Sequence, residues 1–268
     1  GASSDVRIVA PAEVRFDGLA FSPDGDFVFY SAYPGSGGVA SLFKIPVLGG
    51  QPTRILEDID SPVAFSPDAK QIAFIRGDMR RGVNEVMIAS ADGSGARQVG
   101  APKPPDVLMP EALSWSPDGR TILATANSTR PIPSSVIAID AATGETHSIG
   151  EPWAFVRDVR WLPDGRSFLV AALDTSGMGQ PQLWQLSYPS GQRARVTNDL
   201  NAYLGTSMSA DGRAVATVQT ETSGSLYVVQ DASGEPRRLT AGADRVDGSQ
   251  GMAWLPDGTF YVSDGYNG

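Results

Sequence analysis

Six aspartates recur along the chain at nearly regular intervals, and carboxylates are side chains that bind hard metal ions or act as acids and bases. They are Asp24, Asp68, Asp118, Asp164, Asp211 and Asp257, separated by 44, 50, 46, 47 and 46 residues. Each stands in Ser-Pro-Asp-Gly or a near copy, between two short apolar stretches. Proline presets φ for a turn, and an aspartate carboxylate accepts hydrogen bonds from backbone N–H groups just ahead. We therefore predict six hairpin turns here rather than a ring of metal ligands.

The chain has one histidine, His147, in the segment THSI. A Ser-His-Asp triad or a histidine zinc site would need this side chain in a cleft. THSI has the pattern of an outer strand, so we predict a surface histidine. The sequence also has no Gly-x-Ser-x-Gly elbow between a strand and a helix. We expect no catalytic residues, no bound metal and no cofactor, and hence no enzyme activity in this chain.

Charged and amide side chains that do not repeat stand just upstream of the repeated phrases. Carboxylates, arginines and amides that converge on one mouth of a channel bind a polar ligand, a peptide terminus or a cation. The alternative is a solvated rim of loops with local ion pairs. The candidate ligand-binding residues are Arg15, Asp17, Asp60, Glu111, Arg157, Asp158, Asn201, Tyr203, Arg245 and Asp247.

The elements that would position these residues follow from the repeat. In the second unit, four short apolar stretches cover residues 63–65, 71–75, 85–89 and 96–99, and no helical period of useful length occurs. A period in the mid-forties indicates units that bury a core by stacking on each other. We predict one all-β domain over residues 1–268, a six-bladed β-propeller with four-stranded antiparallel blades. A two-sheet sandwich is the alternative, but it does not explain the period. The expected blades cover residues 17–57, 62–100, 112–150, 158–197, 205–240 and 250–268 with 5–10.

The last predicted blade is unusual because its unit supplies only two strands before Gly268. The segment VRIV, residues 6–9, resembles the fourth strands of other units. We expect it to close the ring by adding to the sheet of residues 252–263, which removes a free edge. A third strand would still be missing, so this blade is incomplete or the native protein continues beyond Gly268.

Aromatic residues occupy one register of the repeat. Trp115, Trp161 and Trp254 stand at matching positions, with Phe21 and Phe65 in the same register. A stacking platform for sugars is conceivable, but a register shared by successive repeats favours packing between blades. Trp153 lies outside this register and is the aromatic to examine for partial exposure.

Composition excludes several classes of partner. The net charge is −9 and no lysine- or arginine-rich run occurs, so we expect no nucleic-acid partner. The absence of cysteine excludes disulfide frameworks and thiolate metal sites. No apolar run approaches the roughly 18 residues that a transmembrane helix needs, so we expect no membrane contact by this chain itself.

Four longer phrases resemble one group of bacterial propellers. They are VRIVAPAEVRFDGLAFSPDG from Val6, LFKIPVLGGQPTRILEDIDSPVAFSPD from Leu42, LWQLSYPSGQRARVTNDLNAYLGTSMSADG from Leu183 and GMAWLPDGTFYVSD from Gly251. The repeats resemble TolB-like or WD-like (PD40) repeats, and the phrases are most similar to the C-terminal propeller of membrane-anchored, eukaryotic-like serine/threonine kinases. The resemblance covers nearly the whole chain.

In that family a kinase domain and a transmembrane helix precede the propeller. The resemblance thus implies an extracytoplasmic sensor, on the periplasmic or cell-surface side, that recognises a small polar ligand, a peptide or a protein. The kinase motifs themselves are absent from this chain. Two other functions remain open: a propeller that gates a prolyl oligopeptidase-type peptidase, and a hydrolase or lyase propeller with a metal in its channel.

Overall fold

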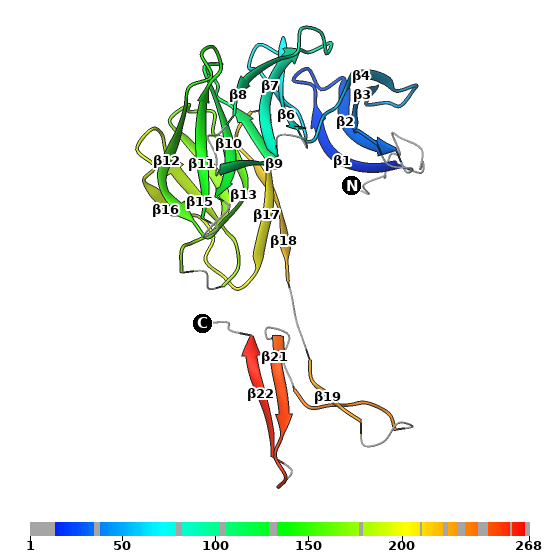
Figure 1. Ribbon diagram of the computed structural model, residues 1–268, viewed down its shortest axis with the longest axis vertical. Helices are drawn as coiled ribbons and strands as arrows, with labels where there is room; N and C mark the ends of the chain where they lie inside the picture. The colour runs from blue at the N-terminus through cyan, green and yellow to red at the C-terminus, as the bar shows by residue number, and fades with distance from the viewer. Residues whose placement is uncertain are drawn as a thin grey trace.

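The computed structural model contains four blades of the expected kind. It describes residues 14–34, 38–78, 82–101, 106–128, 133–176, 179–209, 211–221, 225–229, 234–240, 246–257 and 259–265. Four sheets in this part of the chain have four antiparallel strands each, and three further sheets have two (Figure 1). The all-β propeller prediction is therefore confirmed, whereas only four blades are complete in the described residues.

The strands follow one another along the chain from blade to blade. The first blade contains β1 (Val14–Phe21), β2 (Phe27–Pro34), β3 (Ser41–Pro46) and β4 (Thr53–Glu57), and the second contains β5 (Ala64–Phe65), β6 (Gln71–Asp78), β7 (Val83–Ser90) and β8 (Arg97–Gly100). The third contains β9 (Asp106–Trp115), β10 (Thr121–Ser128), β11 (Ser134–Asp140) and β12 (Thr146–Trp153), and the fourth contains β13 (Phe155–Trp161), β14 (Ser167–Leu173), β15 (Gln182–Ser187) and β16 (Arg193–Arg195).

The remaining strands pair only in twos. They are β17 (Ala202–Met208) with β18 (Val215–Thr220), β19 (Tyr227–Val228) with β20 (Arg237–Arg238), and β21 (Val246–Trp254) with β22 (Phe260–Gly265). Figure 1 shows the hairpin β21–β22 standing apart from the four blades. The segment VRIV, expected to close the ring, lies outside the described residues. No described segment forms a helix of the length and apolarity needed to cross a bilayer.

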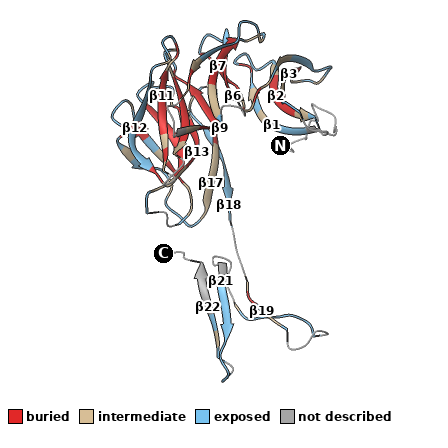
Figure 2. Cartoon of the chain, in the orientation of Figure 1, coloured by how far each residue is buried: buried red, intermediate tan, exposed pale blue. Residues whose placement is uncertain are grey.

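Most of the core lies between blades, and one smaller cluster lies within the first blade. Buried clusters join the first blade to the second, the second to the third and the third to the fourth. The second strand of a blade is therefore buried on both faces, as in β10 and β14, and its sequence is a continuous apolar run. In contrast, every residue of β18 is exposed, because no blade covers it (Figure 2).

The repeated tryptophans follow the same rule. Trp115 and Trp161 pack between blades and are 8% and 5% exposed, which confirms the packing prediction for them. Phe21 and Trp254 are both 58% exposed, because they lie at the two ends of the array where no neighbouring blade packs. Trp153 is fully buried, so the idea that it is partly exposed is wrong.

One turn of the array carries an unfavourable backbone conformation. The turn glycines Gly25, Gly119, Gly165 and Gly212 have φ between 62° and 80°, and the second turn places Ala69 at φ 60°. A side chain with a Cβ is disfavoured in this left-handed region by about 1–2 kcal/mol, against about 0.5–1 kcal/mol of entropy that glycine costs.

Ala69→Gly is therefore expected to raise the free energy of unfolding by about 0.5–1 kcal/mol in urea denaturation. Ala142→Gly is the matched control, because Ala142 is exposed in a turn and has no positive φ. It is expected to lower stability by a similar amount. Equal losses in both variants would contradict the strain at Ala69.

Candidate functional site

The repeated turn aspartates are bound within their own turns, which confirms the structural prediction. Asp68 accepts from the Ser66 hydroxyl at 2.7 Å and from the Lys70 N–H at 3.1 Å. The Asp118 and Asp211 turns repeat this pair of contacts. Among the described residues, no group of three or more acidic or histidine side chains is arranged to hold a metal ion.

These contacts give stability a pH dependence of known sign. The serine hydroxyl and then the backbone N–H lower the pKa of Asp24, Asp68, Asp118 and Asp211 below 3.8. A lowered folded-state pKa stabilises the protein above the unfolded pKa, and that stabilisation is lost as pH falls through the folded pKa. The melting temperature is therefore expected to fall steeply below about pH 4.

Asp68→Asn and Ser66→Ala provide the test, since the first removes the titrating group and the second removes the largest cause of its lowered pKa. Each is expected to flatten the dependence of melting temperature on pH below about pH 4, whatever its effect at neutral pH. A wild-type slope retained in both variants would contradict the assignment to the turn.

His147 is exposed in the edge strand β12, as predicted. Its neighbours Thr146 and Ser148 are also exposed. The imidazole therefore lies on the outer surface of the third blade, away from the first strands.

The candidate ligand-binding residues lie mostly within the first strands, not before them. Five whose strands the structure places are Arg15 and Asp17 in β1, Glu111 in β9, Tyr203 in β17 and Asp247 in β21. Arg157 and Asp158 are both in β13. The expectation that these residues precede the first strands is wrong, because strand pairing extends upstream past a β-bulge. The side chains of Asp17, Glu111 and Asp247, and all of Arg245, lie outside the described residues.

The bulges recur at nearly the same place in the repeat. The pairing register shifts between Val156 and Asp158 in β13 and between Leu204 and Thr206 in β17. The extra residue is Arg157 in β13. A bulge frees a side chain from the strict alternation of a strand and is common beside binding sites.

Asp60 joins the first two blades. The Tyr33 hydroxyl donates to its Oδ1 at 3.1 Å, and the Gly77 N–H donates to its Oδ2 at 2.7 Å. The Arg15 guanidinium lies 4.6 Å from the centre of the Tyr33 ring. Arg15 and Asp60 are thus brought together through Tyr33, and both Asp60 oxygens accept hydrogen bonds. This arrangement holds two blades together.

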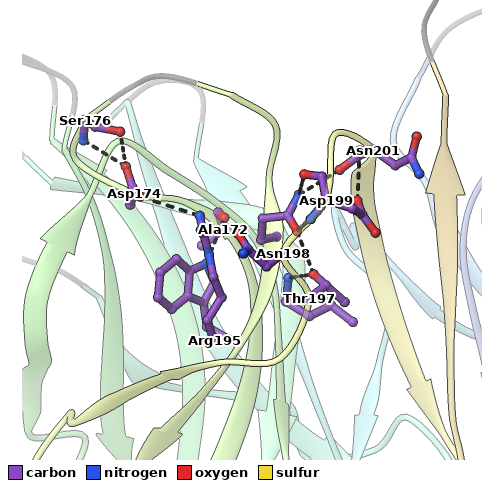
Figure 3. Close-up of polar contacts among 11 residues, drawn as sticks. Ala172, Asp174, Ser176, Arg195, Thr197, Asn198, Asp199 and Asn201 are labelled. Carbon is purple, nitrogen blue, oxygen red and sulfur yellow. Dashed lines mark hydrogen bonds and ion pairs between the residues drawn. The ribbon is translucent and has the colours of Figure 1, made fainter. Parts of the chain in front are cut away.

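Asn201 lies in a hydrogen-bonded loop between the fourth blade and β17 (Figure 3), and Tyr203 follows it within β17. The Tyr203 hydroxyl donates to Asp199 Oδ2 at 2.6 Å, and the Asn201 N–H donates to Asp199 Oδ1 at 2.9 Å. The hydrogen bond to the Asp199 carboxylate raises the pKa of Tyr203. Buried Gln182 anchors the loop by donating to the carbonyls of Asp199 and Asn201.

Sequence reasoning missed Gln182. The available signal was an amide directly after Pro181 and just ahead of the third-strand segment LWQLS. Beside it, Arg195 donates to Asn198 Oδ1 at 2.6 Å and lies 3.8 Å from Asp174 Oδ2 (Figure 3). The Asp199 carboxylate, the Gln182 amide and the Arg195 guanidinium therefore hold the shape of this loop.

Arg157 and Asp158 lie together on the wall of a pocket between β13 and β17. The pocket has a volume of about 300 Å³ and is lined by Arg157, Asp158, Arg160, Leu204, Gly205 and Thr206. The first strand of the fourth blade, β13, contacts the first strands on both sides of it, β9 and β17. The pocket therefore opens where the innermost strands of the array meet.

Asp158 is the structural centre of this pocket. Its carboxylate is buried, and Oδ2 accepts from the Thr206 N–H at 2.5 Å and from the Thr206 hydroxyl at 2.6 Å. Arg160 Nη2 donates to the Thr206 carbonyl at 3.2 Å. Both contacts cross from the fourth blade to β17, so they fix the spacing of the two strands that line the pocket.

Sequence reasoning missed Arg160 and Thr206. Arg160 could have been found as a charged residue inside the apolar segment VRWL. Thr206 gave no such signal, because its role depends on a partner 48 residues away.

The comparison with family models decides the family. The model of the TolB β-propeller domain, PD40, matches residues 61–262, which is well over half of the chain. The chain belongs to the TolB β-propeller family. A TolB-like propeller is a binding scaffold, and the pocket between β13 and β17 is a candidate site on it. No curated protein matches the sequence.

Solved structures show the same fold as this TolB-like propeller. A structure assigned to TolB of Agrobacterium tumefaciens has a TM-score of 0.61 and 19% identity, covering 93% of this chain and 90% of that chain. TolB of Acinetobacter baumannii has a TM-score of 0.56 and 18% identity, covering 91% and 72%. An oligogalacturonate lyase in complex with manganese has a TM-score of 0.62 and 12% identity, covering 92% and 71%. At these identities the similarity concerns the fold.

Proposed function

We propose that this chain is a non-catalytic recognition module that binds a polar ligand, a peptide or a partner protein at the pocket between β13 and β17. The observation that carries the proposal is the pairing of Arg157 and Arg160 on one concave wall with a fixed polar frame, Asp158 and Thr206. A concave site with a few convergent polar groups is the usual form of a ligand-binding site. The module itself performs no reaction.

The proposal places this module outside the cytoplasmic membrane, as the sensor part of a membrane-anchored serine/threonine kinase. The support is the resemblance of four long phrases, including LFKIPVLGGQPTRILEDIDSPVAFSPD from Leu42, to that group of propellers. The sequence encoded upstream of Gly1 tests this context. A kinase domain followed by one apolar helix is expected there, and a different domain would remove the kinase role while leaving the binding site.

The proposal also includes a closed ring of six blades. Support comes from exposed apolar side chains at both ends of the array: Leu19 and Phe21 in β1, and Met252 and Trp254 in β21. Contact between the two ends would remove both apolar faces from water. A closed ring of this length has an expected radius of gyration of about 18 Å in small-angle scattering. A clearly larger value in a monomeric sample would contradict closure.

Ligand screening by thermal shift tests the binding function, since a ligand bound only by the folded state raises the melting temperature. The panel contains carboxylates, phosphate, neutral sugars, amines and divalent cations. At least one class is expected to stabilise the wild-type chain and to lose its effect in Arg157→Ala. A panel without any stabilising class would contradict a small-molecule site, and an effect unchanged in Arg157→Ala would contradict this pocket.

A further inference from the structure

The charges on the pocket wall have the opposite sign to the protein as a whole. Arg157 and Arg160 contribute two positive charges and Asp158 one negative charge, whereas the chain carries −9. Within the described part of the chain, neither arginine forms an ion pair. The wall therefore offers one uncompensated positive charge in an acidic protein, which attracts an anion to this place.

Arg160 holds a hydrogen-bond donor that the protein leaves unused. Its Nη2 is bound to the Thr206 carbonyl, but its Nε is buried and has no hydrogen-bond partner. A buried donor without an acceptor is costly, and most buried polar groups in proteins are paired. Because Nε is covered in the structure, an oxygen atom supplied from the pocket would satisfy this donor after a small movement of the Arg160 side chain.

Asp158 limits the charge of the anion. Its carboxylate lines the same pocket and is fixed by two hydrogen bonds from Thr206. Two arginines and one fixed carboxylate balance a single negative charge. A dianion such as hydrogen phosphate would leave an excess negative charge close to Asp158, and like charges in such a site repel.

We propose that the pocket between β13 and β17 binds the carboxylate group of its ligand, with Arg160 Nε donating to one carboxylate oxygen and the exposed Arg157 guanidinium supplying the second contact. This inference rests on the proposed function and names the chemical class of the ligand. Arginine is suited to the role because its planar donors match the geometry of a carboxylate. A volume of about 300 Å³ accommodates a carboxylate with a few attached atoms.

A free carboxylate of this kind comes from a peptide C-terminus or from a small organic acid. Calorimetric titration of the whole chain distinguishes the two sources with three probes: an acetylated tri-alanine peptide with a free C-terminus, the same peptide as its C-terminal amide, and propionate. Inorganic phosphate is the fourth titrant. The free-acid peptide and propionate are expected to bind more tightly than phosphate, and the amidated peptide is expected not to bind. Tighter binding of the peptide acid than of propionate would assign the site to a peptide terminus.

Two substitutions locate the binding. Arg160→Lys keeps the positive charge but removes Nε, and Arg157→Ala removes an exposed side chain of the pocket wall. Each is expected to weaken carboxylate binding about ten- to a hundredfold, as for loss of one charge-assisted hydrogen bond. Arg166→Ala is the control, because Arg166 is exposed in the turn of the same blade. It is expected to bind as the wild type does.

The outcomes separate this inference from the proposed function. Binding of a neutral or cationic probe that is lost in Arg157→Ala would overturn the carboxylate assignment and keep the pocket as a recognition site. Carboxylate binding that is unchanged in both arginine variants would overturn the pocket itself. Failure of both free-acid probes to bind the wild-type chain, or equal binding of the amidated peptide, would also overturn the carboxylate assignment.

Discussion

Asp158→Ala is expected to lower the free energy of unfolding by about 2–4 kcal/mol. Asp158 and Thr206 are only 6% and 7% exposed, and one carboxylate oxygen accepts both Thr206 donors. Alanine would leave a buried N–H and a buried hydroxyl without partners, and each such group costs about 1–3 kcal/mol. Because these two hydrogen bonds join the fourth blade to β17, the loss is expected to loosen the pocket as well as the fold. Urea denaturation measures the change.

Two companion variants identify the cause. Asp158→Asn keeps an oxygen acceptor for Thr206 but loses the charge, so an intermediate loss is expected. Asp211→Ala removes a carboxylate that also accepts two hydrogen bonds, but at the surface of the next turn, and a much smaller loss is expected. If Asp158→Ala lowered the free energy of unfolding no more than Asp211→Ala does, the contact between the fourth blade and β17 would not be formed in solution.

Trp153→Ala is expected to lower the free energy of unfolding by about 3–5 kcal/mol, the usual loss for a large aromatic in a core. Trp153 ends β12 in the third blade and is fully buried. Its ring packs edge-on against Trp184 of the fourth blade at 5.3 Å, and the Arg193 guanidinium lies 3.6 Å from its centre. Burial lowers the pKa of Arg193, in agreement with its position over the ring. The substitution would open a cavity between two complete blades.

Trp153→Phe separates ring packing from hydrogen bonding. The indole N–H of Trp153 is buried without a hydrogen-bond partner, so Trp153→Phe removes no hydrogen bond. This variant is expected to lower the free energy of unfolding clearly less than Trp153→Ala does. Leu48→Ala is the surface control, because Leu48 is 94% exposed, and a change within about 0.5 kcal/mol is expected. A Trp153→Ala protein as stable as Leu48→Ala would show that the contact between the third and fourth blades is not formed in solution.

The local parts of this fold could be predicted because their causes lie within a few residues. The Ser66–Asp68–Lys70 turn needs only its own side chains and backbone, and the sequence repeats it. The apolar second strands, such as the one containing Phe74, also carry their own signal. The backbone conformation of Ala69 could not be predicted in this way. Only its φ value shows that this alanine, which stands where other turns have glycine, is in the left-handed region.

The candidate site could be predicted only in part. Arg157 and Asp158 stand out as adjacent charges before an apolar stretch, but their position inside β13 depends on a bulge that the sequence does not reveal. The frame of the pocket depends on Thr206, which is 48 residues from Asp158 and becomes its neighbour only when blades stack. Tyr203 had suitable chemistry for a ligand, but its hydroxyl is bound to Asp199, whereas Asn201 contacts Asp199 through its backbone N–H and not through its side-chain amide.

The central claim is that the pocket between β13 and β17 recognises a carboxylate through the unused donor of Arg160. Nuclear magnetic resonance of the arginine side chains observes this donor directly, with Arg160→Lys identifying the Arg160 Nε–H signal by its disappearance. On titration with propionate or the free-acid peptide, this signal is expected to move downfield as the proton enters a hydrogen bond, while the signal of exposed Arg166 stays in place. An Arg160 signal that does not move while binding proceeds would contradict the account.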